Sequence, residues 1–272
     1  MKTEIQQLLR DLKAAAILGR PEAIDIALNG LLSLPGVASN DRVQAGFIDQ
    51  VILPVSKILS SLKSAQLRPL LDHQLAVGRA IGAAALAYRF VDGKDVGQKD
   101  LRKPAVDPRA EVRIALGRTL FLTAGIAPEK LLTLGTTWII QPAPKLRHTA
   151  LIFLPALGET QYGARIVGLL GSLGSDDNRD VRSALVDALD HLAQSGLTES
   201  VLGLLTLWGS EAKPNSWVIC RVLLASWAAD YPAQVESILR DLVSKIGETS
   251  EISNVLKALR RHGVEIKNLS EK

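Results

Sequence analysis

Apolar residues recur three and four positions apart along most of this 272-residue chain, which is the spacing of one face of an α-helix. The first such stripe consists of Ile5, Leu8, Leu9 and Leu12. The pattern predicts helices over residues 3–18, 21–34, 43–62, 70–90, 111–123, 128–139, 145–157, 162–173, 179–193, 198–208, 216–229, 232–246 and 252–262. The connections are short and carry Gly, Pro, Asn or Asp, as turns between stacked helices do. We therefore predict an all-α protein.

Local signals mark some helix ends and one irregular stretch. Ser39 to Asp41 offers an N-cap for the helix that begins at Val43, and Pro54 is expected to bend that helix. Residues 91–106 break the pattern, because Gly and Pro interrupt a run of charged residues there. We expect an exposed loop or a stunted helix in this stretch. The residues after Gly263 are polar and are expected to fray.

One charged motif occurs twice. Residues Asp107 to Leu120 read DPRAEVRIALGRTL, and residues Asp176 to Leu189 read DDNRDVRSALVDAL. Both place an Asp five residues before a Val-Arg pair, followed by small and apolar residues on one helix face. A motif that recurs at a fixed interval indicates a packing unit, which buries its core by stacking on its neighbours.

The Arg of the Val-Arg pair measures the interval. Arg79, Arg113, Arg147 and Arg182 follow one another at spacings of 34, 34 and 35 residues. The same interval leads back to Val43-Gln44 and forward to Ser216-Trp217. Trp138 and Trp208 are 70 residues apart, which is two intervals. A period of this length holds two helices and two turns, the unit of an α-solenoid.

The turn Asp followed by Val-Arg at the start of a second helix resembles the HEAT repeat. The signatures of the tetratricopeptide and ankyrin repeats are absent from the sequence. The resemblance covers residues 21–262 and implies a right-handed α-solenoid of about six to seven stacked helix pairs. Residues 1–20 would then be an N-terminal capping helix and residues 263–272 a polar tail, within one domain over 1–272.

In the HEAT family the turn Asp and the helical Arg form a ladder between adjacent repeats. The resemblance implies this structural role for Asp107, Asp176, Arg113 and Arg182. Gln141 stands where an Asp would serve Arg147, so this step of the ladder is expected to lack its acid. The Arg residues also have a second interpretation, because evenly spaced guanidinium groups along a groove can hold phosphates or an acidic partner surface.

The tryptophans divide into two pairs. Trp138 and Trp208 occupy one repeat position and are expected to be core spacers. Trp217 and Trp227 break the repeat, and Asp230 and Tyr231 follow Trp227 at spacings of three and four, on one face of a predicted helix. One interpretation is a Trp-rich terminal cap. The other is similarity to the HEAT-like DNA glycosylases for alkylated bases, whose sites combine Trp with Asp in a cationic groove.

Composition and charge leave the partner open. The chain has 32 basic and 28 acidic residues, a net charge of +4, 47% hydrophobic and 4% aromatic residues, so it is mildly basic without a dense cationic tract. Apolar runs such as Ile81 to Tyr88 are shorter than the roughly 20 residues of a membrane span, and no secretory signal is recognised at the N-terminus. We expect a cytoplasmic protein without a membrane partner.

Candidate chemistry is sparse. The single Cys220 excludes an internal disulfide, and its apolar neighbours predict an inert buried thiol. The four histidines, at 73, 148, 191 and 262, have no motif spacing for a metal. No nucleophile, phosphate-loop or dinucleotide-binding motif appears in the sequence. We predict a chain that is not an enzyme, with no catalytic residue, metal or cofactor.

The favoured function is that of an interaction scaffold or adaptor, a non-catalytic subunit of a larger complex that binds another protein on the concave helix face. The candidate partner-binding residues are Arg79, Arg147, Lys94, Lys99, Arg102, Lys103, Trp217 and Trp227. The alternative is a nucleic-acid-binding protein or a HEAT-like DNA glycosylase. HEAT-like lyases that attach tetrapyrroles are neither favoured nor excluded, and the sequence leaves the oligomeric state open.

Overall fold

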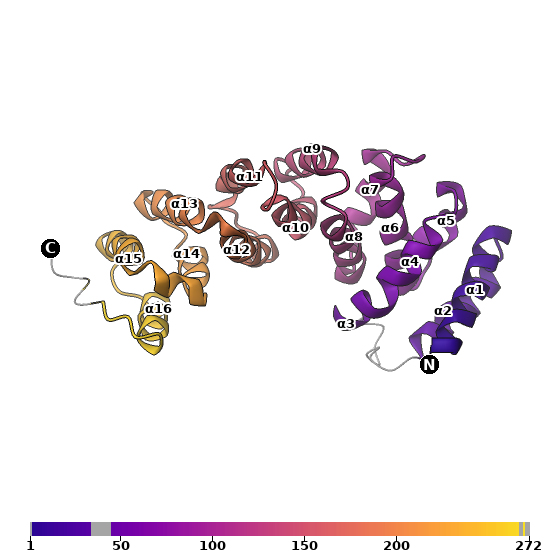
Figure 1. Cartoon of the computed structure of the whole chain (residues 1–272), viewed down its shortest axis with the longest axis horizontal. Coiled ribbons are helices and arrows are strands. Elements are labelled where there is room, and N and C mark those ends of the chain that lie inside the picture. Colours follow the sequence, from indigo (N-terminus) through magenta and orange to yellow (C-terminus); the bar gives the residue numbers. More distant parts are fainter. Residues whose placement is uncertain (1, 34–44, 267–268, 270–272) are drawn as a thin grey trace. The chain divides into compact units, whose positions relative to one another are not determined.

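The computed structural model describes residues 2–33, 45–266 and 269 of the chain. These residues form helices, turns and loops, and none of them lies in a β-strand, which confirms the all-α prediction. The chain divides into two compact units, residues 1–134 (unit 1) and 135–272 (unit 2). Figure 1 shows the helices of both units, and the predicted single domain over 1–272 stays a prediction.

Unit 1 packs around one central helix. Its elements are α1 (Lys2–Leu18), α2 (Pro21–Leu32), α3 (Ala45–Phe47), the π-helical η1 (Ile48–Ile52), α4 (Leu53–Leu59), α5 (Ser64–Leu71), α6 (Ala76–Val91), α7 (Gln98–Ala105), α8 (Ala110–Leu122) and most of α9 (Pro128–Ile139). Helix α6 contacts α2, α4, α5, α7 and α8. It is buried on nearly every side, as expected of a helix that is apolar all round.

Small residues allow the close packing of α6, as its Gly- and Ala-rich sequence leads one to expect. A Cβ atom added at Gly82 would lie 3.1 Å from the backbone nitrogen of Leu71, and one added at Gly78 would lie 3.0 Å from Cβ of His73. Ser56 of α4 also donates a hydrogen bond to the carbonyl of Ile81, at 3.0 Å. Helices α4 and α5 therefore approach the backbone of α6 more closely than larger side chains would allow.

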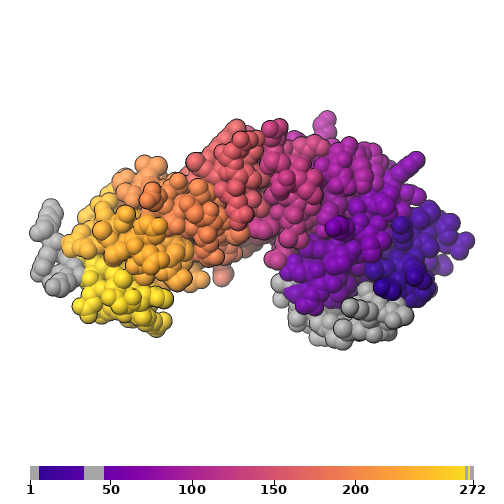
Figure 2. Space-filling view, viewed as in Figure 1, coloured from indigo at the N-terminus to yellow at the C-terminus, as the bar shows by residue number. Residues whose placement is uncertain are grey.

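Unit 2 consists of two rows of helices. The elements that follow α9 are α10 (Pro144–Phe153), η2 (Leu154–Leu157), α11 (Gly163–Leu170), η3 (Gly171–Leu173), α12 (Arg179–Leu192), η4 (Ala193–Leu197), α13 (Thr198–Ser210), α14 (Ser216–Val222), η5 (Ser226–Asp230), α15 (Pro232–Ile246) and α16 (Ser250–Arg261). Helices α11, α13 and α15 pack in one row, and α10, α12, α14 and α16 pack in the other (Figure 1). Side chains close the spaces between neighbouring helices of each unit (Figure 2).

Trp138 and Trp208 are core residues of unit 2, as predicted, and each is 2% exposed. The Trp138 ring meets Phe153 edge to face, with the ring centroids 5.9 Å apart. The indole nitrogen of Trp208 donates to the carbonyl of Gly171 at 3.2 Å, which pairs its polar end inside the core. The repeated Trp position is therefore a packing position.

Side-chain caps and glycines fix several helix ends. The side chain of Asn178 accepts hydrogen bonds from the backbone nitrogens of Asp180 and Val181, which places the start of α12. At the other end of a helix, Gly247 has a φ of 74° directly after α15. Glycine adopts this left-handed conformation without the strain of a side chain. Boundaries predicted from Asn and Gly are therefore close to the observed ones.

Two predicted helices were wrong in extent. The segment predicted as one helix over residues 70–90 consists of α5 and α6, with a break at residues 72–75. The segment predicted over residues 216–229 is α14 up to Val222, and a 3₁₀ helix, η5, follows from Ser226. Apolar periodicity continues across both breaks and therefore does not reveal them.

Other predicted features have mixed outcomes. Residues 91–106 contain the short helix α7, so the stunted helix is the correct alternative for much of that stretch. The expectation that the chain frays after Gly263 is wrong for Ile266 and Leu269, because both apolar side chains are buried. The predicted N-cap at residues 39–41 and the motif position at residues 43–44 lie outside the described residues.

Candidate interaction site

Arg79 connects two successive repeats of unit 1. Its Nε and Nη2 atoms donate to the carboxylate of Asp107, at 2.8 and 3.3 Å. Its Nη1 atom donates to the carbonyls of His73 and Gln74, both at 2.8 Å. The guanidinium group of α6 therefore holds both the turn that precedes its own helix and the acid that precedes α8.

Arg147 makes the same set of contacts in unit 2. Its Nε and Nη2 atoms donate to Asp176 at 2.7 and 3.2 Å, and its Nη1 atom donates to the carbonyls of Gln141 and Pro142 at 2.8 and 2.9 Å. The prediction that Arg147 lacks an acidic partner was wrong. Its acid lies 29 residues later, in the turn of the next repeat, and the predicted position six residues earlier supplies only a carbonyl.

The two acids are held by their own turns. The Oδ1 atom of Asp107 accepts from the backbone nitrogen of Arg109 at 2.8 Å, and the Oδ1 atom of Asp176 accepts from the backbone nitrogen of Asn178 at 2.9 Å. Each carboxylate therefore forms an Asx turn at the start of a helix and receives a guanidinium from the preceding repeat. We call Arg79, Asp107, Arg147 and Asp176 the charged ladder, and each Arg with its acceptors a rung.

The charged ladder differs from the predicted site in two respects. Arg79 and Arg147 were predicted to bind a partner, but their Nε, Nη1 and Nη2 atoms all donate within the chain. Arg113, which was predicted to serve a ladder acid, is buried and donates from Nη1 to the carbonyls of Asp107 and Pro108 at 2.7 and 3.3 Å. The Asp of each observed rung binds the Arg of the repeat before it.

His73 occupies a ladder position without being an acid. It lies 34 residues before Asp107 and six before Arg79, and its Nδ1 atom accepts from the backbone nitrogen of Leu75 at 3.0 Å. Its Nε2 atom lies 2.8 Å from Oδ1 of Asp25 on α2. The acceptor role of Nδ1 assigns the proton to Nε2, so His73 donates to Asp25. Its spacing from Asp107 was the signal that sequence reasoning missed.

Trp217 of α14 lies against two arginine side chains. The Cζ atom of Arg182 lies 5.8 Å from the centroid of the Trp217 ring, and that of Arg221 lies 6.0 Å from it. Both distances are within the range of cation–π contacts. The Nε atom of Arg182 is buried and has no hydrogen-bond partner among the described residues. Arg182 was predicted as a ladder residue, yet its guanidinium faces an aromatic ring.

Trp227 is bound to α12. Its indole nitrogen donates to Oδ1 of Asp190 at 2.9 Å, and the other carboxylate oxygen accepts from Gln194 at 2.9 Å. Trp227 and Asp230 are three residues apart in the 3₁₀ helix η5 and therefore share a face, as predicted, whereas Tyr231 lies beyond the end of this helix. The acid that accepts from Trp227 is Asp190 of α12, and no sequence motif indicates this contact.

A second acid accompanies Asp190. The pKa of Asp187 is raised by partial desolvation and by the charge of Asp190, while Arg221 acts in the opposite direction. Asp187 as a whole is exposed, so the consequence for stability is small. Residues Arg182, Asp187, Asp190, Trp217, Arg221 and Trp227 thus gather aromatic, cationic and acidic groups from α12, α14 and η5. We call these six residues the Trp217 cluster.

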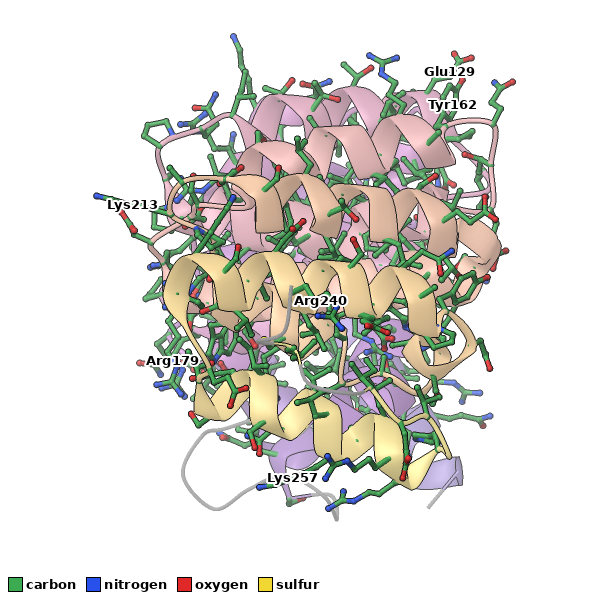
Figure 3. The ribbon with its side chains drawn as sticks, turned by 90° about the vertical axis from the view of Figure 1, so that its left-hand side faces the viewer. Glu129, Tyr162, Arg179, Lys213, Arg240 and Lys257 are labelled. Atoms are coloured by element: carbon green, nitrogen blue, oxygen red, sulfur yellow. The ribbon has the colours of Figure 1, made fainter. Side chains whose placement is uncertain are left out.

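The four candidate partner-binding residues of the stretch 91–106 divide into two that form ion pairs with described residues and two that do not. Lys94 binds Asp92 at 2.7 Å, and Lys103 forms an ion pair with Asp72. Lys99 and Arg102 are exposed on α7 and form no ion pair with any residue that the structure describes. In unit 2, Lys213 and Lys257 are likewise exposed and lie at the surface (Figure 3). The free positive charge of α7 is therefore that of Lys99 and Arg102.

The loop before α7 is fixed by Asp95. Arg89 donates from Nε to Oδ1 of Asp95 at 2.9 Å, and the backbone nitrogen of Ser64 donates to Oδ2 at 3.1 Å. The hydrogen bonds from Arg89, followed by those from Ser64, lower the pKa of Asp95 to about 2. Three elements of unit 1, namely α5, α6 and the loop to α7, are therefore joined at one carboxylate.

Cys220 is a buried thiol, as predicted. Burial, with a smaller contribution from the charge of Glu251, raises its pKa to about 12. Among residues 2–33, 45–266 and 269, no group of three or more His, Cys, Asp or Glu side chains is arranged to hold a metal ion. No helix in these ranges is long and apolar enough to cross a lipid bilayer.

No protein-family model matches the chain, and no curated protein matches it in sequence. Among solved structures, the chain is similar to an engineered protein, with a TM-score of 0.36 and 14% identity over 73% of this chain and 99% of that chain. This similarity is too low to assign a fold family. The contacts within each unit define the class at a coarser level, an all-α protein of packed helices.

Proposed function

We propose that the chain is a HEAT-like α-solenoid that acts as a cytoplasmic interaction scaffold, a non-catalytic subunit that binds another protein on its helix surface. One observation carries the proposal. The regularly spaced Arg79 and Arg147 are bound to Asp107 and Asp176, so the repeated charges serve the stacking of one helix pair on the next. We therefore expect the partner to be bound by surface residues that take no part in this Arg–Asp pairing.

The exposed charges of unit 1 support a partner with an acidic surface. Lys99 and Arg102 carry positive charge on α7 without an ion pair among the described residues, whereas Lys94 and Lys103 have acidic neighbours. Cations on the rim of an interface mainly increase the association rate and select the partner. We therefore place the first contact of the partner at Lys99 and Arg102.

Affinity capture from the native host tests the scaffold. The tagged full-length chain should recover one protein in near-equal amount, and reversing the charges of Lys99 and Arg102 to Glu should reduce that recovery. Exchanging Lys257 for Glu is the control, because Lys257 is exposed on α16 and forms no ion pair among the described residues. A monodisperse chain that recovers no protein would end this proposal.

A nucleic-acid function is the second candidate, and the Trp217 cluster is the observation that favours it. The Trp217 ring with its two guanidinium groups, and the indole of Trp227 that donates to Asp190, are the residue types that bind an extruded base and its phosphates. This hypothesis predicts DNA binding that weakens steeply with salt, and base excision that is lost in Trp227→Ala or Asp190→Asn. Absence of DNA binding at low salt would exclude it.

A further inference from the structure

Arg182 lies in the same sequence register as Arg79 and Arg147, but no carboxylate of the described residues binds its guanidinium group. At Arg79 and Arg147, a carboxylate 28 or 29 residues later binds Nε and Nη2. The residue 29 positions after Arg182 is Glu211. Glu211 is exposed where α13 ends, and its backbone carbonyl accepts from Nζ of Lys245 at 2.9 Å. No ion pair joins Glu211 to Arg182 among the described residues.

The groups around Arg182 do not replace the missing charge. The Trp217 ring contacts the guanidinium but carries no formal negative charge, and it also faces the exposed Arg221. The two acids of the Trp217 cluster, Asp187 and Asp190, interact with other residues. Both oxygens of Asp190 accept from Trp227 and Gln194, and Asp187 acts on Arg221. Two cations therefore share one uncharged ring.

We propose that Arg182, Trp217 and Arg221 form a binding site for a carboxylate side chain of an acidic segment in a partner protein. The bound carboxylate supplies from outside the negative charge that Asp107 and Asp176 supply to Arg79 and Arg147 from within. It contacts Arg221 and the terminal nitrogens of Arg182, because Nε of Arg182 is buried. Arg182 is half-buried, so its charge is less hydrated than that of a fully exposed Arg and interacts more strongly with an anion. The inference rests on the proposed scaffold function and identifies the chemistry of its ligand.

A protein carboxylate fits the site better than a nucleic acid does. The two complete rungs show that guanidinium groups in this register bind carboxylates by donating hydrogen bonds from Nε and Nη2. A short acidic peptide is therefore the appropriate probe.

The test is isothermal titration of the full-length protein with an acetylated hexaglutamate peptide at low salt. We expect the peptide to bind the wild type, and Arg182→Gln, Arg221→Gln and Trp217→Ala each to weaken binding by about tenfold or more. Arg165→Gln is the control, because Arg165 is exposed on α11 and should leave the affinity unchanged. Urea unfolding of each variant identifies losses that come from misfolding.

Three results would overturn the inference. The folded wild type does not bind the peptide, or the folded variants Arg182→Gln and Arg221→Gln bind it as tightly as the wild type does. The third is that the protein binds a single-stranded oligonucleotide in preference to the peptide. Partner capture separates this inference from the scaffold proposal. Capture that succeeds equally with wild type and Arg182→Gln contradicts only the site, whereas peptide binding that requires Arg182, with no partner captured, supports the site and contradicts the scaffold.

Discussion

The guanidinium of Arg147 binds the carboxylate of Asp176, 29 residues later in the chain, through Nε at 2.7 Å and Nη2 at 3.2 Å. The pair joins α10 to the turn that precedes α12. The side chains of Arg147 and Asp176 are only 16% and 5% exposed, so each charge depends on the other. The contacts of this pair recur at Arg79 and Asp107, which identifies them as part of the repeat.

Removing the charge of Asp176 should destabilise unit 2. Asp176→Asn keeps an acceptor for the backbone of Asn178 but leaves Arg147 without its counter-ion, at a cost of about 2–4 kcal/mol. Asp177→Asn, at an exposed neighbouring position, should change stability by less than about 0.5 kcal/mol. All four tryptophans lie after residue 134, so urea unfolding followed by tryptophan fluorescence measures unit 2 directly. Equal midpoints for the two variants would contradict the structural role of the rung.

The contact between Gly174 and Trp208 should tolerate no side chain. A Cβ atom at Gly174 would lie 2.4 Å from the indole ring, and we expect Gly174→Ala to destabilise unit 2 by about 1–3 kcal/mol. Gly203→Ala provides the opposite control, because nothing lies within 4 Å of that added atom and alanine is favoured in the helix by about 0.5–1 kcal/mol. Urea midpoints that shift in the same direction for both variants would show that the packing at Trp208 is incorrect.

Asp95 should titrate far below an ordinary aspartate. Its pKa of about 2 is lowered first by Arg89, so the ionised form is favoured in the folded state. The resulting stability is present above the unfolded pKa of about 3.9 and is lost as the pH falls from there towards 2. We expect Arg89→Lys to raise the pKa of Asp95 in a carboxyl NMR titration, because lysine lacks the planar fork. An unchanged pKa would remove Arg89 as the cause.

Cys220 should be unreactive until unit 2 opens. With a thiol pKa of about 12, the thiolate is about one part in ten thousand at pH 8, and the side chain is also shielded from solvent. Alkylation by iodoacetamide should therefore be negligible in the folded protein and rise with urea in parallel with the tryptophan fluorescence change. Rapid labelling of the native protein would contradict the burial of α14.

Sequence reasoning identified the regular spacing of the Arg residues but not the acid that each of them binds. The spacing of Arg79, Arg113, Arg147 and Arg182 is visible because a repeat must place equivalent residues at equivalent positions. The acid that each Arg binds depends on how one helix pair rests on the next. The sequence allows an acid either six residues before each Arg or 28 to 29 residues after it. Position 141, six residues before Arg147, is Gln and supplies only its carbonyl, whereas Asp176 accepts hydrogen bonds from Nε and Nη2.

The contacts of the Trp217 cluster were likewise only partly predictable from the sequence. The unusual position of Trp217 at the end of the Arg series was visible in the sequence, whereas Asp190 was not, because it lies 37 residues before Trp227 and has no motif of its own. The break between α5 and α6 was missed because Leu70, Leu71 and Leu75 continue the apolar periodicity across it. Contacts between distant elements decide such details.

The most direct test of the central hypothesis compares a ladder variant with a surface variant in two measurements. We predict that Asp176→Asn lowers the urea midpoint of unit 2 but still captures the partner under conditions where it is folded. The double charge reversal at Lys99 and Arg102 should keep the wild-type thermal unfolding profile and lose most of the captured partner. Capture that is unaffected by the charge reversal, together with a urea midpoint that is unaffected by Asp176→Asn, would contradict both the ladder and the binding surface.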